Sequence, residues 1–295
     1  MYRYVVGASA ALALSVGAGA AASAADLSVP PPTPVYTKAP AVVAPAPNWT
    51  GWYVGLNAGG DWGTSNGSTS QFCNLVAFAA GGGCFGTDVS TPINAVGASQ
   101  RFNTSGFTGG IQGGYNWQSG SWLVGFEADF DAFRSRGSTT ASGLVTLGGA
   151  AGSMLSINSS LTTDWLFTAR PRVGWVTGNW LFYGTGGLAV ADLRGNWSFL
   201  DVTGVGNITE SASGSATKAG WVVGAGFETM ISGRWTLGLE YLYTKFNGVS
   251  AIGLVNTPAG APPSGNTFPH STDLSDNILR VRLNYKFGDP VVARY

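Results

Sequence analysis

The sequence WLVGFEADFDAF, residues 122–133, alternates large apolar side chains, beginning with Trp122, with small or charged ones. The charged positions are Glu127, Asp129 and Asp131. Because successive side chains of a β-strand point to opposite faces, this pattern predicts a strand with one apolar and one acidic face. A charge facing lipid at mid-membrane costs about 2–4 kcal/mol, so the acidic face indicates the interior of a membrane-spanning barrel.

Seven further segments repeat this alternation at about the same length. Each has about ten to fourteen residues, close to what a tilted strand needs to cross a bilayer. The even total predicts an all-β fold, an eight-stranded antiparallel transmembrane up-and-down β-barrel. The eight predicted strands are 49–62, 106–118, 122–133, 161–176, 180–192, 219–230, 235–246 and 277–287.

The connections between these segments alternate between short and long. Three of them, 118–121, 177–179 and 231–234, are tight turns that contain glycine. The others are roughly 20–45 residues and rich in Ser, Thr, Gly and Asn. Short periplasmic turns and long extracellular loops are typical of outer-membrane barrels. The alternative is a soluble barrel, which would turn its apolar faces inward.

Tryptophan positions support a membrane setting, because amphipathic aromatic rings are favoured at the two membrane interfaces. Trp49 adjoins the short-turn ends of the predicted strands, as does a group that we predict to form an aromatic girdle. The girdle residues are Trp52, Trp117, Trp122, Trp175, Trp180 and Trp235. The tryptophans near the long-loop ends are Trp62, Trp165, Trp197 and Trp221.

Charged residues fall on the face opposite the large apolar residues in the predicted strands. An eight-stranded barrel has a narrow interior that side chains can fill, and buried charges need partners of opposite sign. We therefore predict a lumen closed by an ion-pair network. Its predicted members are Glu127, Asp129, Asp131, Arg170, Arg172, Glu228, Glu240, Arg280, Arg282 and Lys286.

The chain divides into four predicted parts. Residues 1–24 read as a cleaved signal peptide, because an Ala-rich apolar stretch ends in the small-x-small pattern at Ala22-Ser23-Ala24. A retained anchor helix is the alternative. Residues 25–47 hold seven of the fourteen prolines and predict a semi-rigid periplasmic linker. The barrel takes residues 48–288, followed by a short tail at 289–295.

Composition narrows the class of protein further. Only 10% of the residues are charged, against about 25% in ordinary soluble domains. Fifteen basic and fifteen acidic residues balance, which argues against nucleic acid as a partner. Cys73 and Cys84 predict one local disulfide that closes a loop, with two free thiols as the alternative. No metal-ligand cluster or nucleotide motif is present in the sequence, so no cofactor is expected.

The sequence offers little that resembles an active site. His270, the only histidine, adjoins Pro269 in the last predicted loop, where we expect a solvent-exposed residue. A catalytic base needs rigid support, which a loop tip does not give. The carboxylates have basic partners on other strands, so we expect them to form structural ion pairs in the interior. We therefore expect that the protein is not an enzyme. The alternative, an outer-membrane lipid A hydrolase, would lose activity in a His270→Ala variant.

Several motifs resemble the outer-membrane immunogenic proteins of α-proteobacteria, which are small porin-family barrels. WTGWYVG at 49–55 and NAGG at 57–60 are similar to their first strand, and FTGGIQGGYNW at 107–117 to their second. GLEYLY at 238–243 and VRLNYKF at 281–287 are similar to their last two. The resemblance covers about residues 48–288 and implies a barrel similar to the OmpA transmembrane domain. Such chains usually end at the last aromatic strand, whereas here a short segment follows it.

Together these observations predict a protein of the outer membrane with a structural and surface-interaction role in the cell envelope. The alternative is a small-solute channel, which needs looser interior packing or an oligomer. The expected partners are outer-membrane lipid, lipopolysaccharide and the barrel-assembly machinery. Host or environmental ligands are candidates at the external loops.

Overall fold

The computed structural model describes residues 48–73, 94–145, 153–201, 209–256 and 266–288. The predicted signal peptide, the Pro-rich linker and the C-terminal tail lie outside the described residues and stay predictions. Cys84 also lies outside them, so the Cys73–Cys84 disulfide stays a prediction.

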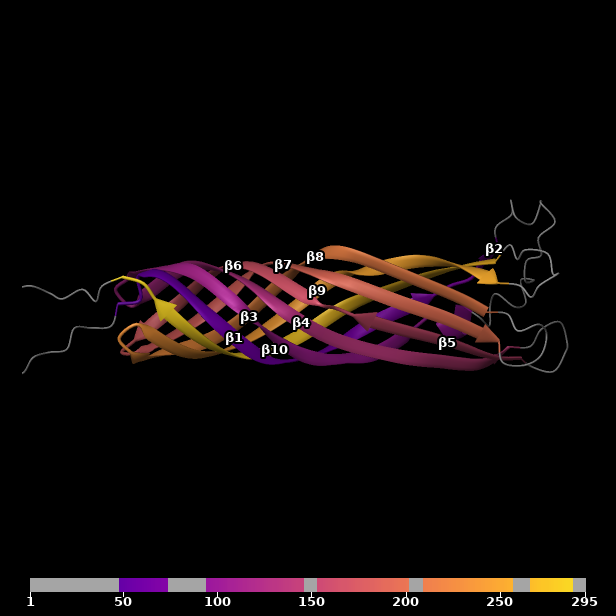
Figure 1. Ribbon diagram of the computed structural model, residues 1–295, viewed down its shortest axis with the longest axis horizontal. Coiled ribbons are helices and arrows are strands. Elements are labelled where there is room, and N and C mark those ends of the chain that lie inside the picture. The colour runs from indigo at the N-terminus through magenta and orange to yellow at the C-terminus, as the bar shows by residue number, and fades with distance from the viewer. Residues whose placement is uncertain (1–47, 74–93, 146–152, 202–208, 257–265, 289–295) are drawn as a thin grey trace, which may run out of the picture. The chain divides into compact units, whose positions relative to one another are not determined.

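The described residues form a closed antiparallel ring of strands (Figure 1). Sequential neighbours pair around the ring, and β1 pairs with both β3 and β10, which closes it. β5 and β6 together occupy one place in the ring, between β4 and β7, while β2 only pairs with the end of β10. The predicted all-β ring of eight strands is therefore confirmed. The strands are β1 Gly51–Thr69, β2 Phe72–Cys73, β3 Gln100–Ser119, β4 Trp122–Val145, β5 Ser153–Thr162, β6 Trp165–Thr177, β7 Trp180–Asp201, β8 Thr209–Ser232, β9 Trp235–Asn256 and β10 Asn266–Lys286.

Ring closure is extensive. The β1–β10 register runs from Tyr53 opposite Lys286 to Thr69 opposite His270. A closed ring leaves no strand edge with unpaired backbone groups, which is the condition for strands to cross a bilayer.

Three tight turns join strands at one end of the ring, as the sequence predicts. Gly120, Gly178 and Gly233 lie in these turns with φ of 60°, 54° and 26°. Glycine adopts this left-handed region without the steric cost that a Cβ brings. We call this end the short-turn end, and the opposite end, where β2 and β5 lie, the far end.

The strands are longer than predicted, so the prediction of four long loops was wrong in extent. β4 and β8 each have 24 residues, against about 9–11 needed to cross a bilayer. The predicted loop at 134–160, for example, is largely strand. Most of its outward positions are Ser, Thr, Asn and Arg, which resemble a loop in composition; Leu144 and Met154 are the exposed apolar exceptions. The predicted strand 161–176 is also two strands, separated at Thr163 and Asp164.

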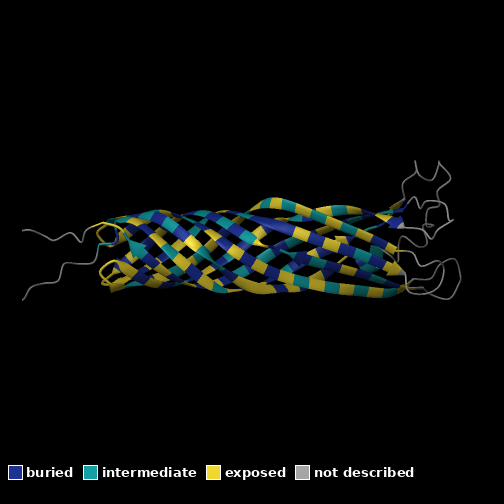
Figure 2. Ribbon diagram, viewed as in Figure 1, coloured by how far each residue is buried: buried dark blue, intermediate teal, exposed yellow. Residues whose placement is uncertain are grey.

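Exposed and buried residues alternate along the strands (Figure 2). Trp52, Val54 and Leu56 point outward, whereas Tyr53 and Asn57 point inward and are buried. The predicted assignment of apolar residues to the outer face is therefore confirmed for β1, and β3 and β10 follow the same parity.

Inward-facing glycines make room for large inward side chains on adjacent strands. A Cβ on Gly114 would lie 2.7 Å from Cζ of Tyr53, and one on Gly226 would lie 2.8 Å from Cζ of Tyr183. The first of these Cβ atoms would also overlap the carbonyl oxygen of Phe126, and the second would lie 2.8 Å from that of Leu239. Real Cβ atoms do not approach this closely, so an alanine at either position would displace the ring and push against the neighbouring strand. Part of the high glycine content therefore serves the packing of a narrow lumen.

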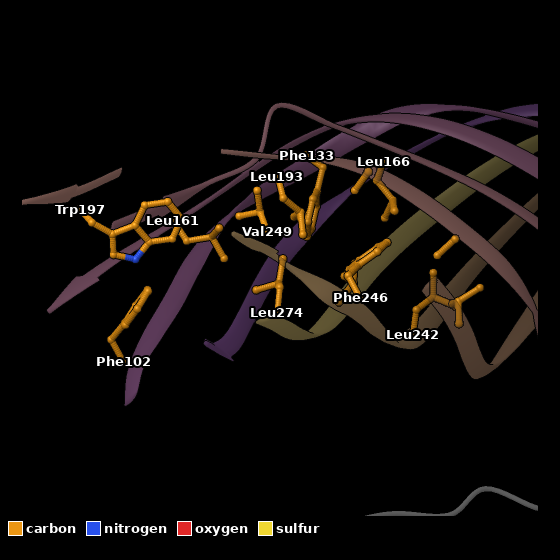
Figure 3. Close-up of a cluster of buried hydrophobic side chains, with 14 residues drawn as sticks. Phe102, Phe133, Leu161, Leu166, Leu193, Trp197, Leu242, Phe246, Val249 and Leu274 are labelled. Carbon is orange, nitrogen blue, oxygen red and sulfur yellow. The ribbon is translucent and has the colours of Figure 1, made fainter. Parts of the chain in front are cut away.

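Apolar side chains fill much of the lumen toward the far end. Phe133, Leu161, Leu193, Phe246 and Leu274 pack there in one buried cluster (Figure 3). The sequence predicts a lumen closed by ion pairs, and this apolar cluster was not predicted.

Candidate functional site

A fully buried ion-pair layer crosses the lumen in its short-turn half. Four arginines from β6 and β10 meet five carboxylates from β4, β8 and β9. The predicted members that the structure brings together are Glu127, Asp129, Asp131, Arg170, Arg172, Glu228, Glu240, Arg280 and Arg282.

Glu240 is the hub of this layer. Its Oε2 lies 2.7 Å from Nη2 of Arg280, and its Oε1 lies 2.9 Å from Nη1 of Arg282 and 3.3 Å from Nη1 of Arg170. The Tyr183 hydroxyl donates to Glu240 Oε1 at 3.0 Å. Three arginines on one carboxylate spread its charge, which offsets the desolvation of all four groups.

Arg280 connects the hub to β4. Its Nη2 lies 3.1 Å from Oδ2 of Asp129, and its Nη1 lies 2.7 Å from Oδ2 of Asp131. Asn57 donates its Nδ2 to the other Asp131 oxygen at 2.8 Å. Arg280 is the only arginine or lysine of the described residues that pairs with Asp131, so this carboxylate depends on it.

Arg172 closes the layer toward the short-turn end. Its Nη1 lies 2.9 Å from Oε1 of Glu228, and its Nε donates to Asn116 Oδ1 at 2.8 Å. The guanidinium lies over the rings of Tyr53 and Tyr183, 4.8 and 5.0 Å from their centroids. The Arg172 guanidinium thus interacts with a carboxylate, an amide oxygen and two aromatic faces, which together offset the cost of burying its charge.

Lys286 does not join the ion-pair layer, which corrects the prediction. It lies at the short-turn end of β10, half-buried, and its Nζ donates to the backbone oxygen of Asn48. Alternation places Lys286 on the inward face as predicted, but at the end of β10 it makes no ion pair with the described carboxylates, although it lines the same small cavity as Glu228.

A second group of carboxyls, which was not predicted, lies farther along the lumen. Asp61 and Asp276 are buried and next to each other, with the Ser135 hydroxyl beside both. Neither makes an ion pair with the described arginines and lysines. Both positions follow the inward parity of their strands, so the charge pattern contains the signal, but only the closing register of β1 with β10 brings them together.

His270 lies inside the barrel on β10 and not in an exposed loop, which corrects the prediction. Its Nδ1 lies 2.9 Å from Thr69 Oγ1, and its Nε2 lies 3.2 Å from Glu210 Oε1. Its ring stacks on Trp197 with centroids 5.3 Å apart. The order of hydroxyl, imidazole and carboxylate resembles a catalytic relay, but Thr69 is only 1% exposed and Gln100 also donates to its hydroxyl. A nucleophile needs access to substrate, which the burial of Thr69 does not give.

The predicted girdle lies outside the short-turn half of the barrel. All six of its rings are exposed, and Trp122 and Trp175 meet edge to face at 4.9 Å. Two other tryptophans differ from the prediction. Trp49 is buried at the short-turn end of the lumen and Trp197 is buried in the apolar cluster. Both lie at inward-facing positions. The prediction used only how near each tryptophan lies to the end of a predicted strand, and this does not show which face it is on.

The lumen offers little free space at the ion-pair layer. A cavity of about 10 Å³ at its short-turn end is lined by Trp49, Tyr53, Arg172 and Glu228, among others. One water needs about that volume. In the described part of the chain, no group of three or more His, Cys, Asp or Glu residues is arranged to hold a metal. None of the described helices is long and apolar enough to span a membrane.

Comparison with known proteins agrees with this geometry. The family model of the outer membrane protein beta-barrel domain matches residues 7–287. The chain belongs to this family. A relative from Brucella melitensis, the 31 kDa outer-membrane immunogenic protein, is 31% identical over 264 residues, which are 86% of this chain and 91% of the relative. The protein of the same name from Brucella suis has the same identity and coverage.

Other relatives and structures are more distant. The 22 kDa outer membrane protein of Rhizobium leguminosarum is 30% identical over 49% of this chain and 54% of its own length. The crystal structure of the outer membrane protein OprG from Pseudomonas aeruginosa has a TM-score of 0.37 at 13% identity, covering 81% of this chain and 96% of OprG. The outer membrane protease OmpT from Escherichia coli has a TM-score of 0.38 at 9% identity, covering 79% and 97%. The family and its named relatives locate this protein in the outer membrane and support the resemblance seen in the sequence.

Proposed function

We propose that this protein is a closed outer-membrane barrel that acts in the structure and surface interactions of the cell envelope, and that it is not an enzyme. The observation that carries the proposal is the filled interior. Four arginines and five carboxylates, all fully buried, cross the lumen in one connected layer.

The apolar cluster adds a second barrier of different chemistry. A hydrated ion would have to cross the ion-pair layer and then the Phe133 and Phe246 rings. Moving an ion into an apolar region without partners is costly, so each barrier alone opposes conduction. With the interior occupied, function moves to the outer surface and to the strands that continue past the membrane.

Planar-bilayer recording on the refolded full chain tests the closed lumen. We expect no reproducible single-channel steps from the wild type. Steps from the wild type would contradict the proposal and favour the small-solute channel. A wide-lumen porin refolded in the same way is the positive control. A Glu240→Ala variant should also show no steps, because the apolar cluster still closes the lumen.

The enzyme alternative has its own test. The hydroxyl of Thr69, the ring of His270 and the carboxylate of Glu210 are the chemically competent groups, and all are buried. We expect no hydrolysis of lipid A by the refolded protein. Hydrolysis that disappears in a His270→Ala variant would contradict this part of the proposal.

A further inference from the structure

We propose that the outer face of β4, β5, β6 and β7 binds one lipopolysaccharide molecule. The inference rests on the proposed function, since it names a partner for the outer surface. Three kinds of side chain follow one another up this face, from the lipid-facing rings toward the far end. We call the whole surface the β4–β7 track.

The lowest level of the track is aromatic. Phe130 and Trp165 stack with ring centroids 5.8 Å apart and an angle of 20° between their planes. Phe107, on the adjacent β3, is 60% exposed. These rings end the lipid-facing band of the barrel, where acyl chains give way to headgroups.

Two unpaired arginines form the next level. Arg134 lies opposite Phe107 in the β3–β4 register, and Arg136 lies between Ser105 on β3 and Thr162 on β5. Both side chains are exposed. They are two residues apart on one face, about 7 Å along the strand. Within the described ranges, neither makes a hydrogen bond or ion pair.

Arg194, an exposed arginine of β7, differs from Arg134 and Arg136 because it has acidic partners. Arg194 pairs with Asp164 at 2.8 Å and with Asp192 at 3.0 Å, so acidic neighbours offset its charge. Arg134 and Arg136 make no ion pair with any carboxylate in the described part of the chain. Two free guanidinium groups at headgroup height suit phosphate, which arginine binds through paired hydrogen bonds.

The highest level is a hollow lined by hydroxyl and amide groups. It holds about 190 Å³ and begins two residues beyond Arg136. Ser138 lies opposite Ser160, which lies opposite Asn196, so three strands contribute at one height. Thr140, Asn158 and Ser198 repeat the pattern one step higher. Short neutral donors and acceptors of this kind suit sugar hydroxyls.

The order of the three levels decides the ligand. Lipopolysaccharide carries acyl chains, then phosphorylated glucosamines, then core sugars, in the same sequence from the membrane outward. A phospholipid has no sugar for the hollow, and free phosphate uses neither the rings nor the hollow. The protein lies in the outer membrane, whose outer leaflet supplies this glycolipid.

Binding of purified glycolipid to the refolded full chain in detergent micelles tests the proposal. The probes are rough lipopolysaccharide, the same material after dephosphorylation, lipid A without core sugars, and inorganic phosphate. An Arg134→Gln/Arg136→Gln variant should bind rough lipopolysaccharide about ten- to thirtyfold more weakly, because each basic residue near an anionic surface contributes about fivefold. An Arg101→Gln/Lys245→Gln variant removes the same charge elsewhere on the outer face and is the matched control.

The hollow has a separate test. A Ser138→Val/Ser160→Val variant keeps strand-forming residues but removes two hydroxyls. It should bind rough lipopolysaccharide several-fold more weakly and lipid A as tightly as the wild type does. Heat-modifiable mobility on gels checks that each variant folds.

Three results would overturn the proposal. One is equal loss of binding in the Arg134/Arg136 and the Arg101/Lys245 variants. Another is wild-type affinity that does not change on dephosphorylation of the glycolipid. The third is competition by millimolar inorganic phosphate as strong as by lipid A. Conductance is measured independently, so a failure here is distinguishable from a failure of the closed-lumen proposal.

Discussion

Replacing Arg280 with methionine tests whether the ion-pair layer stabilises the barrel. Arg280 is fully buried and pairs with Asp129, Asp131 and Glu240 at 3.1, 2.7 and 2.7 Å. Methionine keeps much of the volume and removes the charge. The layer then holds three arginines against five carboxylates, and Asp131 loses its arginine.

The expected loss in the free energy of unfolding follows from the carboxylates that Arg280 no longer neutralises. Removing one partner of a buried ion pair costs about 3–5 kcal/mol, mainly because a charge stays buried without a partner. Arg280 serves three carboxylates, but Glu240 keeps Arg170 and Arg282 and Asp129 keeps Arg170. We therefore expect a loss of about 3–5 kcal/mol, not three times that amount. An Asp131→Asn change in the same chain should recover about 1 kcal/mol or more.

Urea unfolding of the full chain in phospholipid vesicles measures this free energy of unfolding. Tryptophan fluorescence and heat-modifiable gel mobility follow the folded fraction. The matched control is Arg101→Met, an exposed position that should shift stability by less than about 0.5 kcal/mol. A cost below 1 kcal/mol for Arg280→Met, or no recovery by Asp131→Asn, would refute the reasoning. The layer would then block the lumen without contributing net stability.

Three further predictions concern other parts of the barrel. Asp276→Asn should raise the free energy of unfolding by about 1 kcal/mol, because Asp61 and Asp276 are buried side by side without a basic partner; lower stability in urea would contradict this. Gly114→Ala should cost about 1–3 kcal/mol because the new methyl group would overlap both the Phe126 carbonyl oxygen and the Tyr53 ring, whereas Gly113→Ala, where the nearest atom lies 3.5 Å from the new methyl group, should be nearly neutral; equal unfolding midpoints would exclude the packing argument. Finally, intact mass spectrometry of the protein alkylated without reduction should find Cys73 and Cys84 unmodified, and labelling of both thiols would show that the predicted disulfide is absent.

The segment around His270 has a local pattern that does not reveal its place in the fold. Residues 266–276 contain few large apolar side chains. They also include Pro269, and proline is usually confined to the edges of sheets. Read alone, they are typical of a loop. In the structure they continue β10, and Phe268, His270 and Thr272 point inward at every second position. The alternation was present, but without lipid outside it carried no apolar signal.

Arg280 and Lys286 show the same limit for the ion-pair layer. Both lie on the inward face of the last strand, so the alternation assigns both to the lumen. Only the height along the barrel separates them, and height depends on the register between strands. Arg280 lies opposite Glu240 in the β9–β10 pairing, whereas Lys286 lies opposite Tyr53 near the short-turn end.

The sequence by itself determined the membrane barrel, its eight-strand ring, the outward position of its lipid-facing aromatic residues and the inward position of the charges that form the ion-pair layer. These follow from the two-residue period of a strand, which each segment carries locally. The tertiary structure decided how far the strands extend, which charges meet and where the apolar cluster begins. It also decided that Asp61 lies beside Asp276, and that Arg134 and Arg136 stand between aromatic rings and a polar hollow. These properties depend on inter-strand register and ring closure. Both bring together residues of strands as distant in the sequence as β1 and β10, and no single segment encodes them.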